Sequence, residues 1–147
     1  MRVVIHWIAI ICLILILPTV MADEADTDQD GFDDSEDSCP DESGNSTLDR
    51  LGCLDVDGDG WSNPDSNWTI TQGADAFPSR SDAWLDLDMD GFPNNLGLPD
   101  SDDCPFTPGY SRVILNGCSD LDNDFVPDLY DDDADGDGIR NEMERAA

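Results

Sequence analysis

The chain has 147 residues, of which 35 are Asp or Glu and only six are Lys or Arg, so its formal net charge is −29 at neutral pH. Thirty of the acidic residues are Asp, Lys is absent, and the single His lies near the amino terminus. This charge excludes direct binding of nucleic acid, because phosphate contacts need Lys and Arg. The length allows one domain or a short array of small modules.

Residues 1–22 have the pattern of a secretory signal peptide. Arg2 precedes a long apolar run, and the segment ends in small residues at Ala22. We expect an apolar helix over residues 3–20 and cleavage after Ala22, which would make the remaining chain secreted or displayed at the cell surface. An uncleaved membrane anchor is the alternative, since the apolar run is close to the length that spans a bilayer.

The exported part, residues 23–147, is too poor in apolar side chains to build an ordinary core. Leu, Ile, Val and Phe make up 21 of its 125 residues, a proportion typical of disordered chains when the net charge is high. The repulsion among like charges also opposes compaction. Folding therefore requires something that neutralises the Asp carboxylates.

Five short phrases place Asp at positions 1, 3 and 5, and four of them add Gly at position 6. The phrases begin at Asp26, Asp55, Asp86, Asp120 and Asp133. Calcium takes six to eight oxygen ligands, and alternating short carboxylates on a tightly curled backbone can converge on one ion. Gly at position 6 permits the sharp turn, and position 7 supplies a backbone carbonyl. The spacing predicts five calcium loops, with Ca²⁺ as the cofactor.

We number these loops one to five, and the predicted ligands lie at positions 1, 3, 5, 7, 9 and 12 wherever the residue type allows. They are Asp26, Asp28, Asp30, Phe32, Asp34 and Asp37 in loop one (26–37); Asp55, Asp57, Asp59, Trp61 and Asn63 in loop two (55–66); Asp86, Asp88, Asp90, Phe92 and Asn94 in loop three (86–97); Asp120, Asp122, Asp124, Val126, Asp128 and Asp131 in loop four (120–131); and Asp133, Asp135, Asp137, Ile139, Asn141 and Glu144 in loop five (133–144). Loop five matches the EF-hand loop pattern position by position, and we expect a short helix near residues 139–146.

Loops two and three lack an acidic residue at position 12, where they carry Ser66 and Gly97. Either carboxylates from elsewhere, such as Asp65 or Asp100, complete these loops, or the loops bind calcium weakly. In loop four, Phe125 replaces the Gly of the turn. These departures leave the number of ions open, and not the kind of ion.

Four Cys in the exported part form two pairs of equal spacing. Cys39 and Cys53 are as far apart in the sequence as Cys104 and Cys118. The sequences around the two pairs align when Cys39 is aligned with Cys104. We predict that each pair forms a local disulfide, which is one of three possible pairings. Each bond would close a loop of about 15 residues, worth roughly 3 kcal/mol. Zinc is disfavoured as a use of these Cys, because there is no CxxC motif and no His after the leader.

The repeats divide the exported chain into two predicted units. The first covers residues 23–66 with loops one and two, a linker covers residues 67–85, and the second covers residues 86–147 with loops three to five. Eight Pro spread between residues 40 and 127 exclude long helices and central strands. The expected fold is an irregular, calcium-stabilised repeat array with little regular secondary structure.

The phrase from Asp26 to Pro40, D-x-D-x-D-G-x-x-D-x-x-D-S-C-P, resembles the thrombospondin type 3 repeat, with Ser38 where that family usually has Asn. The segment from Cys104 to Cys118 resembles the form of this repeat found in microbial exported proteins. The resemblance covers most of residues 26–144. It implies a chain wrapped around calcium ions, acting as a spacer and as an adhesion or matrix-contact segment.

We therefore expect a calcium-binding structural or adhesion module whose partners are calcium ions and cell-surface or matrix proteins or glycans. No membrane contact is expected unless the leader is retained. A dockerin-like docking module is the alternative, although dockerin loops lead into helices rich in Leu and Lys or Arg. The chain is not expected to be an enzyme, because no His or Lys remains as a general base and a carboxylate pair needs a positioned cleft.

Two further features are weaker signals. Asn45 and Asn67 each begin an Asn-x-Ser/Thr motif between predicted loops, which predicts N-glycosylation at the surface. Trp61, Trp68 and Trp84 are expected to cover the loops with apolar contacts rather than to stack on sugars.

Overall fold

The fold has almost no regular secondary structure. The computed structural model describes residues 25–145, and within them the regular elements are the 3₁₀ helix η1 (Ile70–Gln72) and the helix α1 (Asn141–Glu144). No strand forms in this range, so the expectation of an irregular fold is confirmed. The short helix α1 lies inside the predicted range of 139–146, whereas the predicted signal peptide and its apolar helix lie outside the described residues.

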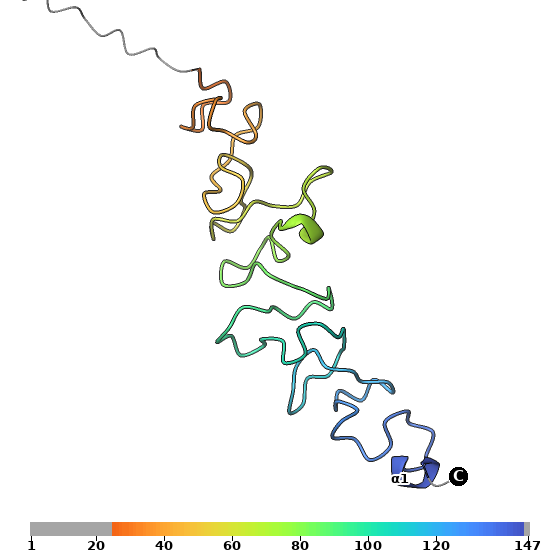
Figure 1. The fold of residues 1–147 in the computed structure, drawn as a ribbon. Coiled ribbons are helices and arrows are strands. Elements are labelled where there is room, and N and C mark those ends of the chain that lie inside the picture. Colours follow the sequence, from red (N-terminus) through yellow and green to blue (C-terminus); the bar gives the residue numbers. More distant parts are fainter. Residues whose placement is uncertain (1–24, 146–147) are drawn as a thin grey trace, which may run out of the picture.

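The chain forms an elongated array whose segments follow one another in sequence order. In Figure 1 the array runs from loop one at one end, past η1 near its middle, to α1 at the opposite end. No helix between residues 25 and 145 is long and apolar enough to cross a membrane.

The interior of the array is polar rather than hydrophobic. The buried apolar side chains in the described residues, apart from Pro, are small except for one Phe; they are Cys53, Ala74, Ala83, Phe92 and Cys118. Carboxylates and hydroxyls are buried instead, and these residues are Ser46, Asp55, Ser62, Asp75, Ser111 and Asp120. Large apolar side chains lie outside, and Leu96 is 98% exposed. Hydrophobic burial therefore contributes little to holding this chain together.

Both predicted disulfides form, Cys39–Cys53 and Cys104–Cys118, each with a Cα–Cα distance of 5.1 Å. The loops that they close have the same internal hydrogen bonds. The amide of Cys53 donates to the hydroxyl of Ser46 at 3.0 Å, and the amide of Cys118 donates to the hydroxyl of Ser111 at 3.0 Å. The duplication in the sequence is thus also a duplication of three-dimensional structure.

Candidate metal centres

All five loops curl through the same backbone conformation. Positions 4 and 6 have positive φ in every loop; at position 4 these are Gln29 (63°), Gly58 (81°), Met89 (65°), Asn123 (63°) and Gly136 (66°), and at position 6 they are Gly31 (100°), Gly60 (96°), Gly91 (91°), Phe125 (74°) and Gly138 (88°). Gly is the residue that adopts this conformation without strain. Loop four reaches it with Phe125, so the missing Gly does not change the path of the backbone.

The Asp side chains hold this curl by accepting amide hydrogen bonds. In every loop the position 1 carboxylate accepts from the amide of position 6, at 2.8–3.2 Å. The position 5 carboxylate accepts from the amide of position 7, at 2.7–2.9 Å. These bonds hold the carboxylates of positions 1 and 5 against the backbone of the curl.

The carboxylates of positions 1, 3 and 5 converge in each loop. One oxygen from each of the three lies within 4.8 Å of the other two; the groups are Asp26, Asp28 and Asp30; Asp55, Asp57 and Asp59; Asp86, Asp88 and Asp90; Asp120, Asp122 and Asp124; and Asp133, Asp135 and Asp137. Oxygens that share a calcium ion at 2.3–2.6 Å must lie within about 5 Å of one another. The spacing therefore suits a hard divalent cation.

Several buried carboxylate oxygens in and beside the loops have no hydrogen-bond partner. Among the described residues, nine of the ten buried side-chain polar atoms without a hydrogen bond are carboxylate oxygens; they belong to Asp28, Asp37, Asp57, Asp59, Asp75, Asp88 (both oxygens), Asp120 and Asp133. Burial of an unpaired carboxylate is unfavourable by several kcal/mol unless a cation or donor compensates. All of these residues lie in or beside the five loops, so the donor set fits a metal ion there.

The residues at position 9 close each loop onto its own first residues. Their amides donate to the carbonyl just before position 1, at 2.7–2.9 Å. Their side-chain oxygens accept the amide of position 2, at 2.5–3.1 Å; the residues are Asp34, Asn63, Asn94, Asp128 and Asn141. Position 9 therefore braces the loop, and its predicted role as a ligand stays a prediction.

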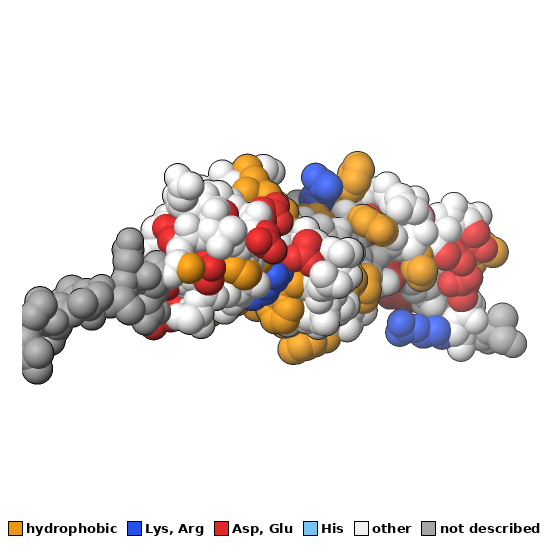
Figure 2. Space-filling model, turned by 90° about the horizontal axis from the view of Figure 1, so that it is seen from above, with side chains coloured by type: hydrophobic (Ala, Val, Ile, Leu, Met, Phe, Trp, Pro, Cys, Tyr) orange, Lys and Arg blue, Asp and Glu red, His pale blue; other side chains and the backbone are white. Residues whose placement is uncertain are grey.

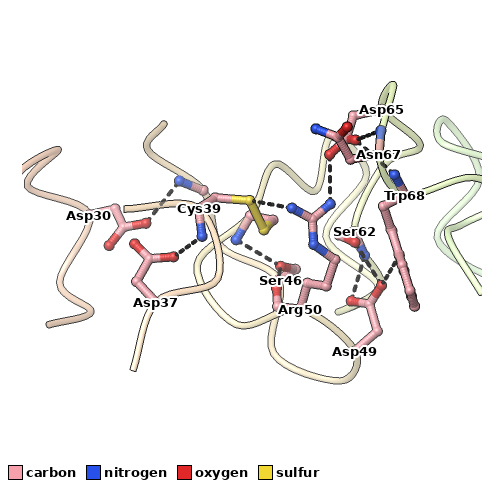
Figure 3. The surroundings of a disulfide bond; sticks show 12 residues. Asp30, Asp37, Cys39, Ser46, Asp49, Arg50, Ser62, Asp65, Asn67 and Trp68 are labelled. Carbon is pink, nitrogen blue, oxygen red and sulfur yellow. Dashed lines mark hydrogen bonds and ion pairs between the residues drawn. A yellow bond between two sulfur atoms is a disulfide. The ribbon is translucent and has the colours of Figure 1, made fainter. Parts of the chain in front are cut away.

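Three loops have an acidic residue at position 12 that lies near the other carboxylates; we call it the closing carboxylate. In loop one, burial raises the pKa of Asp28, and the charges of Asp30 and Asp37 add to the rise. Asp37 and Asp30 lie side by side next to Cys39 in Figure 3. In loop five, Asp135 raises the pKa of Glu144. In loop four, Asp131 lies near enough to Asp122 to interact with its charge.

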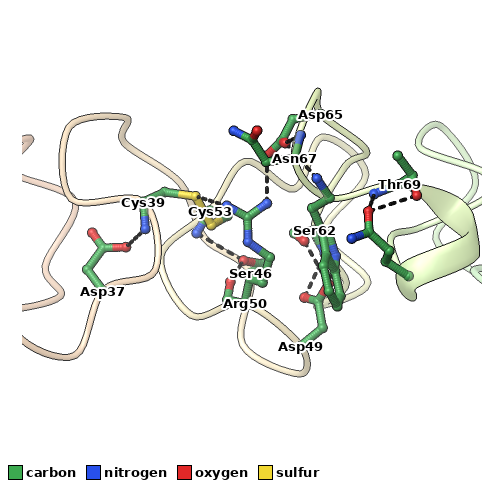
Figure 4. A network of polar contacts seen from close by, with 12 residues as sticks. Asp37, Cys39, Ser46, Asp49, Arg50, Cys53, Ser62, Asp65, Asn67 and Thr69 are labelled. Carbon is green, nitrogen blue, oxygen red and sulfur yellow. Dashed lines mark hydrogen bonds and ion pairs between the residues drawn. A yellow bond between two sulfur atoms is a disulfide. The ribbon is translucent and has the colours of Figure 1, made fainter.

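The two carboxylates considered for loops two and three are engaged with Arg instead. Asp65 pairs with Arg50 at 2.6 Å, and Asp100 pairs with Arg80 at 2.7 Å. These pairs hold the pKa of both carboxyl groups below the usual range. Figure 4 shows Asp65 beside Arg50 next to the first disulfide. These two Asp residues therefore act in ion pairs at the surface.

Two Asp residues that were not among the predicted ligands lie beside loops two and three instead. Asp75 and Asp102 each accept an amide hydrogen bond from the second residue after them, at 2.7 Å, as Asp37 does at the same distance. All three begin an Asp-x-x-Pro phrase, at 37–40, 75–78 and 102–105. That phrase is the signal that could have found them.

Asp102 occupies the same place in the second copy of the duplication as Asp37 does in the first. A Cβ on Gly52 would meet the Asp37 carboxylate at 2.2 Å, and one on Gly117 would meet the Asp102 carboxylate at 2.4 Å. Each closing side chain thus packs against a Gly of the adjacent disulfide loop. Burial, followed by the charges of Asp90 and Asp86, raises the pKa of Asp102.

Among the described carboxyl groups, Asp75 has the most strongly raised pKa. Burial raises the pKa of Asp75 to about 6, and the charges of Asp59, Asp57 and Asp55 contribute to the rise. Asp75 therefore lies within the electrostatic field of all three carboxylates of loop two. The amide of Asp75 donates to the carbonyl of Ser62 at 3.0 Å, which fixes it next to the end of the turn.

Side chains from outside the loops hold loop two in place. The Asp49 carboxylate accepts from the amide and hydroxyl of Ser62 at 2.8 and 2.6 Å, and from the indole of Trp68 at 3.1 Å (Figure 3). Trp61 stacks on Trp84 with ring centroids 6.0 Å apart.

Asn45 and Asn67 are exposed, and glycosylation of these two residues stays a prediction.

A comparison with curated proteins finds a partial match. The chain is 44% identical over 64 residues to thrombospondin-3 from Homo sapiens, and equally to thrombospondin-3 from Mus musculus. The match covers 38% of this chain, and the chain spans about 6% of the length of these relatives. No family model matches the chain. The chain therefore contains a thrombospondin-like region.

Proposed function

We propose that the chain is a calcium-binding module of the cell exterior, in which ions held by the five loops take the place of a hydrophobic core. The observation that carries this proposal is the set of buried carboxylate oxygens that converge in the loops and have no hydrogen-bond partner. The similarity to a part of thrombospondin-3 supports it, as do two disulfides, which are typical of exported proteins.

The donor set favours calcium over other metals. Each loop offers converging carboxylate oxygens and no nitrogen or sulfur ligand. Calcium accepts such irregular, oxygen-only surroundings, whereas magnesium demands a small octahedral site and keeps several waters. Ion uptake and folding are then one equilibrium, because the carboxylates of a metal-free loop repel one another.

In this proposal Asp102 is the closing carboxylate of loop three. Asp102 occupies the position in the second copy of the duplication that Asp37 occupies in the first. Both carboxylates accept the amide of the second residue after them. Asn94, the brace of loop three, donates its side-chain amide to Asp102 at 2.8 Å. The path from position 9 to this carboxylate is longer than in loop one, because it runs from Asn94 to Asp102 and not over three residues.

The module acts as a spacer or adhesive segment rather than as an enzyme. Residues 23–147 carry 35 acidic side chains and five Arg, so five calcium ions would leave a charge of about −20. Such a surface suits contacts with basic patches on cell-surface or matrix proteins, and in Figure 2 acidic and apolar side chains are interspersed on the face shown. Between residues 25 and 145 only loop five leads into a helix, so the docking alternative gains no support.

A calcium titration of the oxidised protein tests the proposal. Isothermal calorimetry and hydrodynamic radius are measured together, first with calcium and then with magnesium as the matched control. We expect contraction on saturable uptake of about five calcium ions, and neither effect with magnesium at the same concentration. An unchanged radius without saturable heat would contradict the proposal and leave a disulfide-bonded polyanion.

A further inference from the structure

We propose that Asp75, which follows loop two in the sequence, is the metal ligand that closes this loop in place of the residue at position 12. This inference rests on the proposed function, since it concerns how one of the five loops completes its set of oxygen ligands. The sequence pattern alone points to Ser66 at this place. Ser66 is exposed, and its neighbour Asp65 is paired with Arg50.

Asp75 is a carboxylate that the fold buries without a counter-charge. Its exposed fraction is 0%, and its Oδ2 is a buried oxygen with no hydrogen-bond partner. No Arg forms an ion pair with it among the described residues. An isolated buried carboxylate is unstable unless it is protonated, paired or bound to a metal. A cation in loop two satisfies this oxygen at neutral pH.

Two hydrogen bonds hold Asp75 beside loop two and leave one of its carboxylate oxygens without a partner. Its amide donates to the carbonyl of Ser62, the residue directly after position 7, at 3.0 Å. Its Oδ1 accepts the amide of Phe77 at 2.7 Å, which leaves Oδ2 for another partner. In loop one Asp37 has the same arrangement, with Oδ1 bound to the amide of Cys39 at 2.7 Å and Oδ2 buried and unpartnered.

The residues between position 9 and Asp75 form an excursion that leaves the loop and returns to it. This excursion, residues 64–74, contains η1, and Gly73 with its φ of 117° leads the chain into buried Ala74. Its outer part is fixed by Trp68, whose indole donates to Asp49 at 3.1 Å. Because the excursion is fixed at both ends, a residue distant in sequence can occupy the place of position 12.

This ligand would make the ion of loop two a connection between the first predicted unit and the segment that follows it. Asp75 lies in the segment 67–85, which was predicted to be a linker, and the amide of Ala76 donates to the carbonyl of Trp84 at 3.0 Å just before loop three. Trp84 in turn stacks on Trp61 of loop two. Calcium bound by both Asp55 and Asp75 therefore connects this segment directly to the first unit.

The test compares Asp75→Asn with two controls in calcium calorimetry of the oxidised protein. Asp82→Asn removes an exposed carboxylate of the same segment, and Ser66→Ala changes the residue at position 12. We expect Asp75→Asn to lose one ion, or to weaken one site at least tenfold, while both controls keep the ion count of the unmodified protein. Terbium alone, excited through the tryptophans, should give weaker sensitised emission in Asp75→Asn because Trp61 lies in the affected loop.

A second readout separates ligation from a purely structural role. Without metal, Asp75→Asn removes an unpaired buried charge, so the radius and melting temperature of the metal-free protein at pH 7 should be unchanged or shifted toward the folded state. A lower metal-free melting temperature with normal ion binding would overturn the inference. If Asp75→Asn does not fold, Asp75→Glu keeps the charge on a longer arm and should weaken one site selectively.

The failure of this inference differs from the failure of the proposed function. Full ion uptake by both the unmodified protein and Asp75→Asn, with affinities equal within twofold, would overturn only the assignment of Asp75. Loss of one ion in Ser66→Ala would overturn it as well. An unmodified protein that takes up no calcium would overturn the proposed function together with this inference.

Discussion

Single residues in the loops show which parts of the pattern the backbone needs. Position 6 has positive φ in all five loops, and in loop four this position is Phe125 with φ of 74°. A side chain in the left-handed region costs about 1–2 kcal/mol. Phe125 is 49% exposed, so the half of its side chain that is buried offsets part of this strain. Loop four thus keeps its geometry at the expense of stability.

We predict that Phe125→Gly changes the stability of the calcium-saturated protein by less than about 1 kcal/mol, because the relief of this strain offsets the loss of a half-buried side chain. Thermal unfolding in excess calcium measures the change. The matched control is Leu121→Gly in the same loop, which removes a side chain that is 66% exposed from a residue without positive φ. The control should destabilise by about 1 kcal/mol, and equal effects of both variants would contradict the explanation.

At the scale of elements, the unit of this fold is a loop together with its closing carboxylate. Three hydrogen bonds recur in all five loops: the amides of positions 6, 7 and 2 donate to the side chains of positions 1, 5 and 9. In the proposed function the closing carboxylate, by contrast, comes from different distances along the chain. In the proposal it is position 12 itself in loops one, four and five, and Asp102, which lies beyond position 12, in loop three. Insertions are tolerated in that interval because the brace at position 9 already closes the loop.

We predict that Asp102→Asn weakens calcium binding at loop three by at least tenfold and leaves the other loops unchanged. The variant keeps the shape of the side chain and removes one ligand charge. Asp103→Asn is the neighbouring control, because Asp103 is exposed and accepts the amide of Asn116 at 2.9 Å. Calorimetry of the two variants tests whether Asp102 binds calcium. An equal loss of calcium affinity in Asp103→Asn would instead indicate a general effect of charge.

At the scale of the whole molecule, the buried carboxylates of the metal-free loops bind protons more readily than ordinary carboxylates do. Burial is the first cause of a raised pKa at Asp28, Asp59, Asp75, Asp88 and Asp102. A carboxyl group whose pKa is higher in the folded than in the unfolded state binds more protons when folded. It therefore stabilises the fold at low pH, and this contribution is lost as the pH rises through the folded-state pKa.

We predict that the metal-free protein loses compactness as the pH rises from about 4 to about 6, the range between the ordinary Asp value and the pKa of Asp75. With calcium the dependence reverses, because protons displace the ion as the pH falls below about 6. Hydrodynamic radius measured against pH, in a chelator and in excess calcium, checks both directions. Expansion of the metal-free protein on acidification through this range would contradict the prediction.

The spacing of the Asp residues determined the five loops without any knowledge of the tertiary structure. The hydrogen bonds that the amides of positions 6 and 7 donate to the carboxylates of positions 1 and 5 connect residues at most five apart. The local order of Asp and Gly is therefore sufficient to specify them. The disulfides were predictable for a similar reason, since each connects two nearby Cys within a duplicated phrase. The low apolar content likewise predicted that no hydrophobic core would form.

Only the tertiary structure decided which carboxylates lie beside loops two and three. Asp65 and Asp100 stand near these loops in the sequence, but Arg50 and Arg80 reach them from distant positions in the chain and hold them at the surface. Asp75 reaches loop two only because η1 and Trp68 turn the excursion back onto Ser62. The burial of a carboxylate depends on the path of the whole segment, and a short loop motif contains no information about that path.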